Sequence, residues 1–153
     1  MAILWITKDN WELFCDELID LSDEFLQLVC HQNPRTATAS REVLAAMVAT
    51  SNTLVLLCQD DSGVGVGISY FNFGSGYSCG GRYLWINCIY IRSGFRQQGD
   101  GTRMLEAIEQ EGRRRGITLM VCSRDRENAG SRQLLARAGF RQEDQVVATK
   151  QID

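Results

Sequence analysis

The sequence contains neither a long apolar run nor a recognisable sorting signal in its first residues. None of its uninterrupted apolar stretches approaches the roughly 20 residues that a membrane-spanning helix requires. Residues Met1–Asp9 lack a basic segment followed by a long apolar one, which is the pattern of a secretory signal. These absences predict a soluble protein with no membrane partner and a cytoplasmic location.

The cysteines lack the spacing of metal or redox sites. Six cysteines are present, but no two of them form a Cys-x-x-Cys pair, so we expect neither a zinc site nor a disulfide. The single histidine, His31, has no cysteine or serine at a spacing that implies a catalytic partner, which favours a role at a helix C-terminus. We therefore expect neither a metal ion nor a histidine base.

A basic surface for nucleic acids is also missing. The net charge is −3 and the isoelectric point is near 5.2. No cluster interleaves basic with aromatic residues, as nucleic-acid surfaces do. The run Arg113–Arg115 has a structural explanation, because it stands at the end of a predicted helix, where the helix dipole favours cations. We predict no nucleic-acid partner.

The composition that is present, with 44% hydrophobic and 23% charged residues, predicts one globular domain over residues 1–153. Apolar periodicity predicts strands at residues 2–6, 53–58, 64–70, 83–91, 117–122 and 146–150, another beginning at 140, and helices at 11–28, 40–48, 104–115 and 128–138. The glycine-rich residues 74–81 are predicted to be a flexible connection. Strands that first cluster and then alternate with helices favour a mixed α/β sheet with helices on both faces.

The most informative stretch is Ile89–Leu105, where a predicted strand passes through a glycine-containing turn into a helix. Gly99 and Gly101 permit positive φ and a bare backbone, so consecutive N–H groups at the helix start can converge on an anion such as a pyrophosphate. A P-loop is excluded because no lysine follows Gly101. A dinucleotide-binding fold is excluded because Met104 stands at the third glycine position.

Two motifs occur in order between residues 83 and 140. The first, Arg96-Gln97-Gln98-Gly99-Asp100-Gly101, fits the pattern Arg/Gln-x-x-Gly-x-Gly/Ala. In the second, Asn128 opens a short helix, the small residue Ser131 follows, and Gly139-Phe140 ends the helix. Together they resemble the motifs of the GNAT superfamily of acyl-CoA-dependent N-acyltransferases.

The resemblance implies the GNAT fold, which is an α/β fold with a mixed, mostly antiparallel central sheet flanked by helices on both faces, here as a single domain over residues 1–153. It implies acetyl-CoA, or a related acyl-CoA, as co-substrate. The expected cofactor-binding residues are Ile89, Tyr90, Ile91, Arg96, Gln97, Gln98, Gly99, Asp100, Gly101, Thr102, Asn128 and Ser131. Among these, the backbone of the central strand would pair with the pantetheine arm, the N–H groups of residues 97–102 would hold the pyrophosphate, and Asn128 would contact the arm.

The resemblance further implies an N-acetyltransferase in which a primary amine of a small molecule attacks the thioester of acetyl-CoA directly. A central-strand N–H near Ile89 is the expected oxyanion donor, Trp85 and Asn87 are expected to line the acceptor pocket, and no catalytic base is identified. Leu135 departs from the family pattern, because many members carry there a tyrosine that protonates the leaving thiolate. Two alternatives stay open: a protein or peptide N-acetyltransferase, and, because Leu135 removes the commonest acid, a non-catalytic acyl-CoA-binding module. A homodimer is allowed for.

The departure at Leu135 has two interpretations. In the first, the side chain faces the cofactor sulfur, and water or another side chain protonates the thiolate. In the second, it packs inward one turn before Gly139 as an ordinary core residue.

Overall fold

The structure is a computed structural model that describes residues 1–29, 39–77, 80–124 and 126–143. In chain order the elements are β1 (Ala2–Ile6), the 3-10 turn η1 (Trp11–Phe14), α1 (Cys15–Val29), α2 (Arg41–Ala49), β2 (Thr53–Gln59), β3 (Gly65–Gly76), β4 (Gly81–Ile91), the 3-10 turn η3 (Ser93–Phe95), α3 (Asp100–Arg114), β5 (Leu119–Cys122) and α4 (Ala129–Arg137). His31 and the predicted strand at residues 146–150 lie outside the described residues. In the described part of the chain, no helix is long and apolar enough to cross a membrane.

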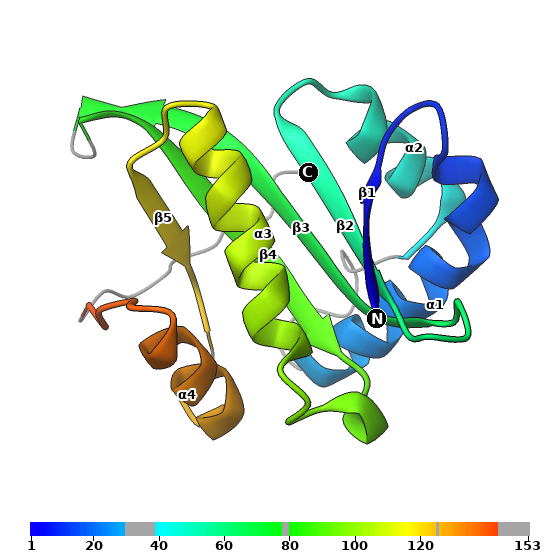
Figure 1. The fold of residues 1–153 in the computed structure, drawn as a ribbon. Coiled ribbons are helices and arrows are strands. Elements are labelled where there is room, and N and C mark those ends of the chain that lie inside the picture. Colours follow the sequence, from blue (N-terminus) through cyan, green and yellow to red (C-terminus); the bar gives the residue numbers. More distant parts are fainter. Residues whose placement is uncertain (30–38, 78–79, 125, 144–153) are drawn as a thin grey trace, which may run out of the picture.

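The described strands form a five-stranded sheet in the order β1-β2-β3-β4-β5 (Figure 1). Neighbouring strands are antiparallel except for β4 and β5, which run parallel. Helices α1 and α2 pack on one face of the sheet, and α3 and α4 pack on the other. The predicted mixed, mostly antiparallel α/β sheet with helices on both faces is therefore confirmed.

A separate apolar core lies on each face of the sheet. The α3-side core joins Met104 and Ile108 of α3 to sheet residues such as Phe71. The α1-side core joins Leu18 and Leu21 of α1 to the opposite face of the same strands. These side chains have almost no exposed surface, and burying each contributes about 1.5–3 kcal/mol of transfer free energy. The two cores fix β4 between them, and β4 leads into the loop before α3 and the first turn of α3, which together carry half of the predicted site residues.

Strand β4 contains a bulge at Asn87. Tyr70 of β3 pairs with Cys88, whereas the next β3 residue pairs with Ile86, so Asn87 is an extra residue in β4. One inserted residue reverses the alternation of side chains. Ile86 accordingly belongs to the α3-side core, whereas Cys88 and Tyr90 belong to the α1-side core.

Two details of the sequence-based prediction are wrong. Residues 74–76 and Gly81, within the predicted flexible connection 74–81, belong to strands, because residues 74–76 pair with residues 81–83 and extend the β3–β4 hairpin. Gly74 is needed there for packing, since a Cβ at this position would overlap the ring of Tyr83. No strand begins at Phe140, because residues 140–143 have no regular structure.

Candidate functional site

The loop between β4 and α3 has the backbone conformation expected of an anion-binding turn. Gln97 has φ of 64° and Gly99 has φ of 91°, both in the left-handed region. Gln97 is the only residue other than glycine with positive φ in the part of the chain that the structure describes, and such a conformation costs an ordinary side chain about 1–2 kcal/mol. The first intrahelical hydrogen bond runs from the Arg103 N–H to the Gly99 carbonyl, at 3.0 Å. The N–H groups before Arg103 therefore have no acceptor within the helix.

The N-terminus of α3 also lacks a side-chain cap. Ser40 caps α2 by accepting from the Val43 N–H, and Asn128 caps α4, but no side chain caps α3 at Gly99. A Cβ built on Gly99 would meet no atom within 4 Å. Uncapped N–H groups and the positive end of the helix dipole favour an anion at this open position. The residues present therefore fit a phosphate group.

Asp100 is the one acidic residue in the first turn of α3, and its side chain is turned into the protein. The side chain is only 8% exposed, and a carboxylate oxygen lies 3.6 Å from the Arg103 guanidinium. The ion pair with Arg103 offsets the negative charge of the buried carboxylate.

Arg96 is held at the entrance of this turn. Its Nε donates a 2.8 Å hydrogen bond to the Ile91 carbonyl, and its guanidinium lies 5.8 Å from the centre of the Tyr90 ring. Tyr90 in turn donates a 2.9 Å hydrogen bond to Glu24 of α1, and the Arg92 guanidinium approaches the same carboxylate to 2.7 Å. We call Glu24, Tyr90 and Arg92 the Glu24 network. It ties the start of the loop to α1.

The charges of the Glu24 network shift its pKa values. Hydrogen bonding from Arg92 lowers the pKa of Glu24 below its ordinary value of 4.5, against the opposing effect of burial. Burial, together with the hydrogen bond to Glu24, raises the pKa of Tyr90. Glu24 is thus held as the anion and Tyr90 as the neutral donor. Sequence analysis missed the network, because Glu24 and Arg92 stand 68 residues apart and only the fold brings them together.

The parallel strands β4 and β5 separate just before the predicted cofactor-binding segment. Their pairing runs from Tyr83 with Leu119 to Ile86 with Cys122, and β4 continues to Ile91 paired only with β3 among the described strands. In Figure 1 both strands point to the edge of the sheet where the loop before α3 and helix α4 lie. The backbone pairing expected at residues 89–91 stays a prediction, and the Ile91 carbonyl already accepts from Arg96.

The second motif forms the predicted capped helix. The Asn128 side chain accepts a 2.9 Å hydrogen bond from the Ser131 N–H. At the other end Gly139 has φ of 84°, and the Phe140 N–H bonds the Leu135 carbonyl at 3.0 Å. This is the 6→1 bond of a Schellman ending.

The two motifs lie together in space. A Cβ added to Gly101, in the first turn of α3, would stand 3.1 Å from the Leu134 side chain of α4. Gly101, the third residue of the Gly-x-Gly pattern, therefore allows close packing of α3 against α4. Gly99, the first residue, allows the left-handed backbone conformation. Leu135 is 6% exposed and belongs to the α3-side core, so its burial supports the core interpretation.

The predicted acceptor residues share the sheet face that α1 and α2 occupy. Asn87 is exposed at the bulge, and its amide donates to the Asn72 side chain of β3. Asn72 donates a 2.6 Å hydrogen bond to Thr53, and Trp85 pairs with Asn72 across the strands. Asn72 and Thr53 were not among the residues predicted from the sequence. The pattern that could have indicated Asn72 is an asparagine inside an alternating apolar strand, where this residue is unfavourable.

Three of the described thiols, Cys58, Cys88 and Cys122, have environments that keep them protonated. Burial raises the pKa of Cys122 to about 11 and that of Cys58 also to about 11. Burial raises the pKa of Cys88 well above its usual range. Because the thiolate is the nucleophile and metal ligand, these three side chains are poor candidates for either role. In residues 1–29, 39–77, 80–124 and 126–143 no group of three or more His, Cys, Asp or Glu side chains is arranged to hold a metal ion.

The sequence was compared with protein-family models and with functionally curated proteins. The family model described as "Acetyltransferase (GNAT) family" matches residues 12–140. No functionally curated protein matches the sequence.

Solved structures with the same fold include several acetyltransferases. An aminoglycoside acetyltransferase from an uncultured soil metagenomic sample has a TM-score of 0.80 at 15% identity, over 99% of this chain and 98% of that one. An aminoglycoside N-acetyltransferase in complex with CoA has a TM-score of 0.76 at 17% identity, over 99% and 100%. A ribosomal-protein-alanine N-acetyltransferase from Brucella melitensis biovar Abortus 2308 has a TM-score of 0.74 at 15% identity, over 99% and 100%. At these identities the likeness establishes the fold.

Proposed function

The chain belongs to the GNAT family of acetyltransferases, and from that premise we propose that it transfers an acetyl group from acetyl-CoA to the primary amine of a small molecule. The observation that carries the proposal is the uncapped N-terminus of α3, which Gln97 and Gly99 hold in the left-handed conformation at the end of β4. The positive end of the helix dipole complements the negative charge of the CoA pyrophosphate, and the backbone N–H groups there can donate hydrogen bonds to the pyrophosphate oxygens.

The binding roles follow from the positions of the residues. The N–H groups of residues 97–102 would hold the pyrophosphate, and the Arg96 guanidinium, fixed through its Nε, would bring a positive charge to the same anion. The backbone of β4 from Ile89 to Ile91, beyond the last pair with β5, would receive the pantetheine arm in the manner of an added strand. Asn128, which directly precedes α4, would contact the arm in addition to capping that helix.

The reaction is the attack of a neutral amine nitrogen on the thioester carbon. The C–N bond forms, the C–S bond breaks with its electron pair on sulfur, and the proton lost by nitrogen passes to solvent or to a base. A thiol has a pKa of about 8.5, so the thiolate is a tolerable leaving group near neutral pH without a donor at Leu135. The proposed oxyanion donor is the N–H of Ile89. It shares a peptide unit with the Cys88 carbonyl, which accepts a 2.6 Å hydrogen bond from buried Ser69, and this bond strengthens the donor.

Direct attack is favoured over an acyl-enzyme. A cysteine nucleophile would need a lowered pKa, and Cys58, Cys88 and Cys122 all have raised ones. We therefore propose a ternary complex of protein, acetyl-CoA and amine.

A turnover screen tests the proposed function. The protein is mixed with acetyl-CoA and panels of alkylamines, polyamines, aminoglycosides, amino acids and short peptides, and release of the CoA thiol is followed. We expect turnover with at least one free amine. Turnover confined to peptides would favour the protein or peptide N-acetyltransferase. Tight acetyl-CoA binding without any turnover would favour the acyl-CoA-binding module that Leu135 leaves open.

A further inference from the structure

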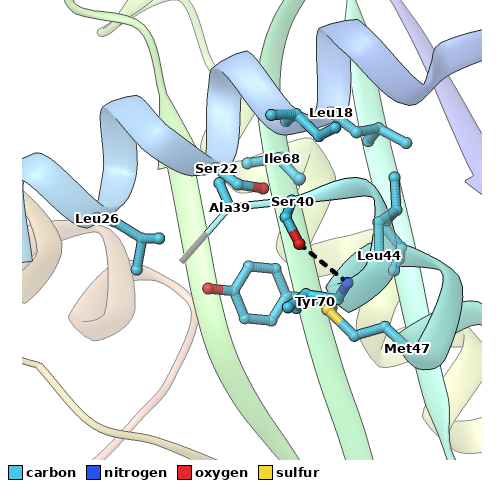
Figure 2. Close-up of a pocket in the computed structure, with 12 residues that line it drawn as sticks. Leu18, Ser22, Leu26, Ala39, Ser40, Leu44, Met47, Ile68 and Tyr70 are labelled. Atoms are coloured by element: carbon cyan, nitrogen blue, oxygen red, sulfur yellow. Dashed lines mark hydrogen bonds between the residues drawn. The ribbon is translucent and has the colours of Figure 1, made fainter. Parts of the chain in front are cut away.

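An open apolar pocket lies between α1, α2 and the sheet (Figure 2). Its floor is formed by the buried side chains of Leu18, Val55 and Ile68, each at most 1% exposed. Its rim is partly exposed, and Val43 on α2 has 43% of its surface accessible. The volume is about 220 Å³, which exceeds the roughly 150 Å³ of an apolar protein cavity that binds benzene. A small aliphatic or aryl group therefore fits.

No charged side chain lines the pocket among the residues that the structure describes. The polar atoms of its lining side chains are the hydroxyls of Ser22, Ser40 and Tyr70. The Ser40 hydroxyl is already used, because it accepts a hydrogen bond from the Val43 N–H at 3.3 Å. Burying an ammonium group without a partner costs several kcal/mol, so such a pocket selects against a second cation in its occupant. Its chemistry suits an uncharged group.

The pocket adjoins the predicted acceptor residues. Tyr70 forms part of its wall and stands two residues before Asn72 on the same face of β3, which is about 7 Å along the strand. Asn72 bonds Asn87 at the bulge, and Tyr70 pairs with Cys88, the next residue of β4. The wall of the pocket is thus continuous with the place where the proposed function puts the acceptor amine.

We infer that this pocket receives the apolar part of the amine acceptor, an inference that rests on the proposed function. The substrate class is then a small primary amine whose nitrogen is joined through a few bonds to an uncharged branched aliphatic or aryl group. Polyamines and aminoglycosides are disfavoured, because they would bring a second cation to a neutral pocket.

The first test compares amines that differ in the group placed in the pocket. Initial rates are measured at saturating acetyl-CoA with 3-methylbutylamine, 2-phenylethylamine, 1,4-diaminobutane and kanamycin. We expect kcat/KM for the two apolar amines to exceed that for 1,4-diaminobutane by at least tenfold. Equal or greater efficiency with 1,4-diaminobutane or kanamycin overturns the inference, and so does acetylation of a leucyl peptide when neither apolar amine reacts.

The second test fills the pocket. Ser22→Leu places a larger apolar side chain in the lining, whereas the control Gln27→Leu makes a comparable change at an exposed α1 position that does not line the pocket. We expect Ser22→Leu to raise KM for 3-methylbutylamine at least fivefold and to leave KM for acetyl-CoA unchanged, and Gln27→Leu to change neither. An unchanged amine KM in folded Ser22→Leu overturns the inference.

A binding measurement separates this inference from the proposed function. The melting temperature is measured with CoA alone and with CoA plus 3-methylbutylamine at millimolar concentration. A shift with CoA and a further shift with the amine, lost in Ser22→Leu, supports the pocket assignment whether or not turnover is seen. A shift with CoA and none with the amine overturns the inference and leaves the proposed cofactor site standing. Absence of a CoA shift contradicts the proposed function.

Discussion

Replacing Gly99 by glutamate should strongly weaken the binding of acetyl-CoA without unfolding the protein. At φ of 91° a non-glycine residue costs about 1–2 kcal/mol of stability, and no atom lies within 4 Å of the new Cβ, so no steric clash adds to this. The new carboxylate would stand about 5 Å from a phosphate. At that separation the repulsion per charge is about 1 kcal/mol in water and about 3 kcal/mol at an effective dielectric of 20. The affinity should therefore fall roughly 5- to 150-fold for each phosphate charge.

Thermal shift and calorimetric titration measure this loss directly. At a concentration of 100 times Kd, acetyl-CoA stabilises the wild type by about 2.7 kcal/mol, and a 100-fold loss of affinity leaves about 0.4 kcal/mol. The matched control is Gly63→Glu, because Gly63 has φ of 82°, has no atom within 4 Å of its Cβ and lies in the β2–β3 turn. It should lose similar stability and keep the full acetyl-CoA shift.

A second ligand localises the effect to the pyrophosphate. S-acetylpantetheine carries the thioester and the arm without the pyrophosphate, so its weaker binding should be the same in Gly99→Glu and in the wild type. If folded Gly99→Glu retains the wild-type shift with acetyl-CoA, the assignment of the α3 N-terminus to the pyrophosphate is wrong. If it loses both ligands equally, the substitution has disturbed the whole cleft, and that result also counts against the assignment.

Three further outcomes are expected. Tyr90→Phe removes the hydrogen bond to Glu24 and keeps the ring beneath Arg96, so steady-state kinetics should show KM for acetyl-CoA raised severalfold at constant kcat; a fall in kcat alone would contradict a positioning role. Leu135→Tyr should lower the free energy of unfolding, measured by urea denaturation, by about 1–3 kcal/mol, because a larger side chain overfills the α3-side core. Unchanged stability would instead indicate that residue 135 faces the cofactor cleft. Hydrogen bonding from Arg114 and then Arg115 lowers the pKa of Glu111 from 4.5 to about 2, so its contribution to stability is complete above pH 4.5 and is lost as the pH falls towards 2. Glu111→Gln should flatten the acid limb of the stability profile in this range, and an unchanged limb would show that the ion pair is immaterial.

The sequence was sufficient where a local pattern determines the structure. The cap at Asn128, the glycine ending at Gly139 and the turn at Gly99 each depend on residues that are close in the chain, and each is confirmed. The ion pairs of Glu109 and Glu111 with arginines four residues later arise from the same kind of local spacing. Local chemistry of this kind is visible before the fold is known.

What could not be predicted depends on pairing between distant residues. The bulge at Asn87 arises from the register between β3 and β4, which no single strand contains. Without it the side chains of Cys88 and Tyr90 would be assigned to the wrong face. The glycine-rich residues 74–76 are typical of a loop in isolation, but their pairing with residues 81–83 makes them part of a hairpin. The partners Asn72 and Thr53 become candidates only once Asn87 is placed beside them.

The bulge at Asn87 also determines how this protein can be recombined with its relatives. A chimera that joins the first half of β4 from one protein to the second half from another preserves both cores only if the extra residue is counted in the junction. A splice that is one residue short would rotate the segment after residue 87 by half a turn, and would send the hydroxyl of Tyr90 into the α3-side core and Ile89 and Ile91 towards α1. The smallest exchangeable unit therefore runs from Ile86 to Cys88, and grafts with boundaries inside it should yield insoluble protein.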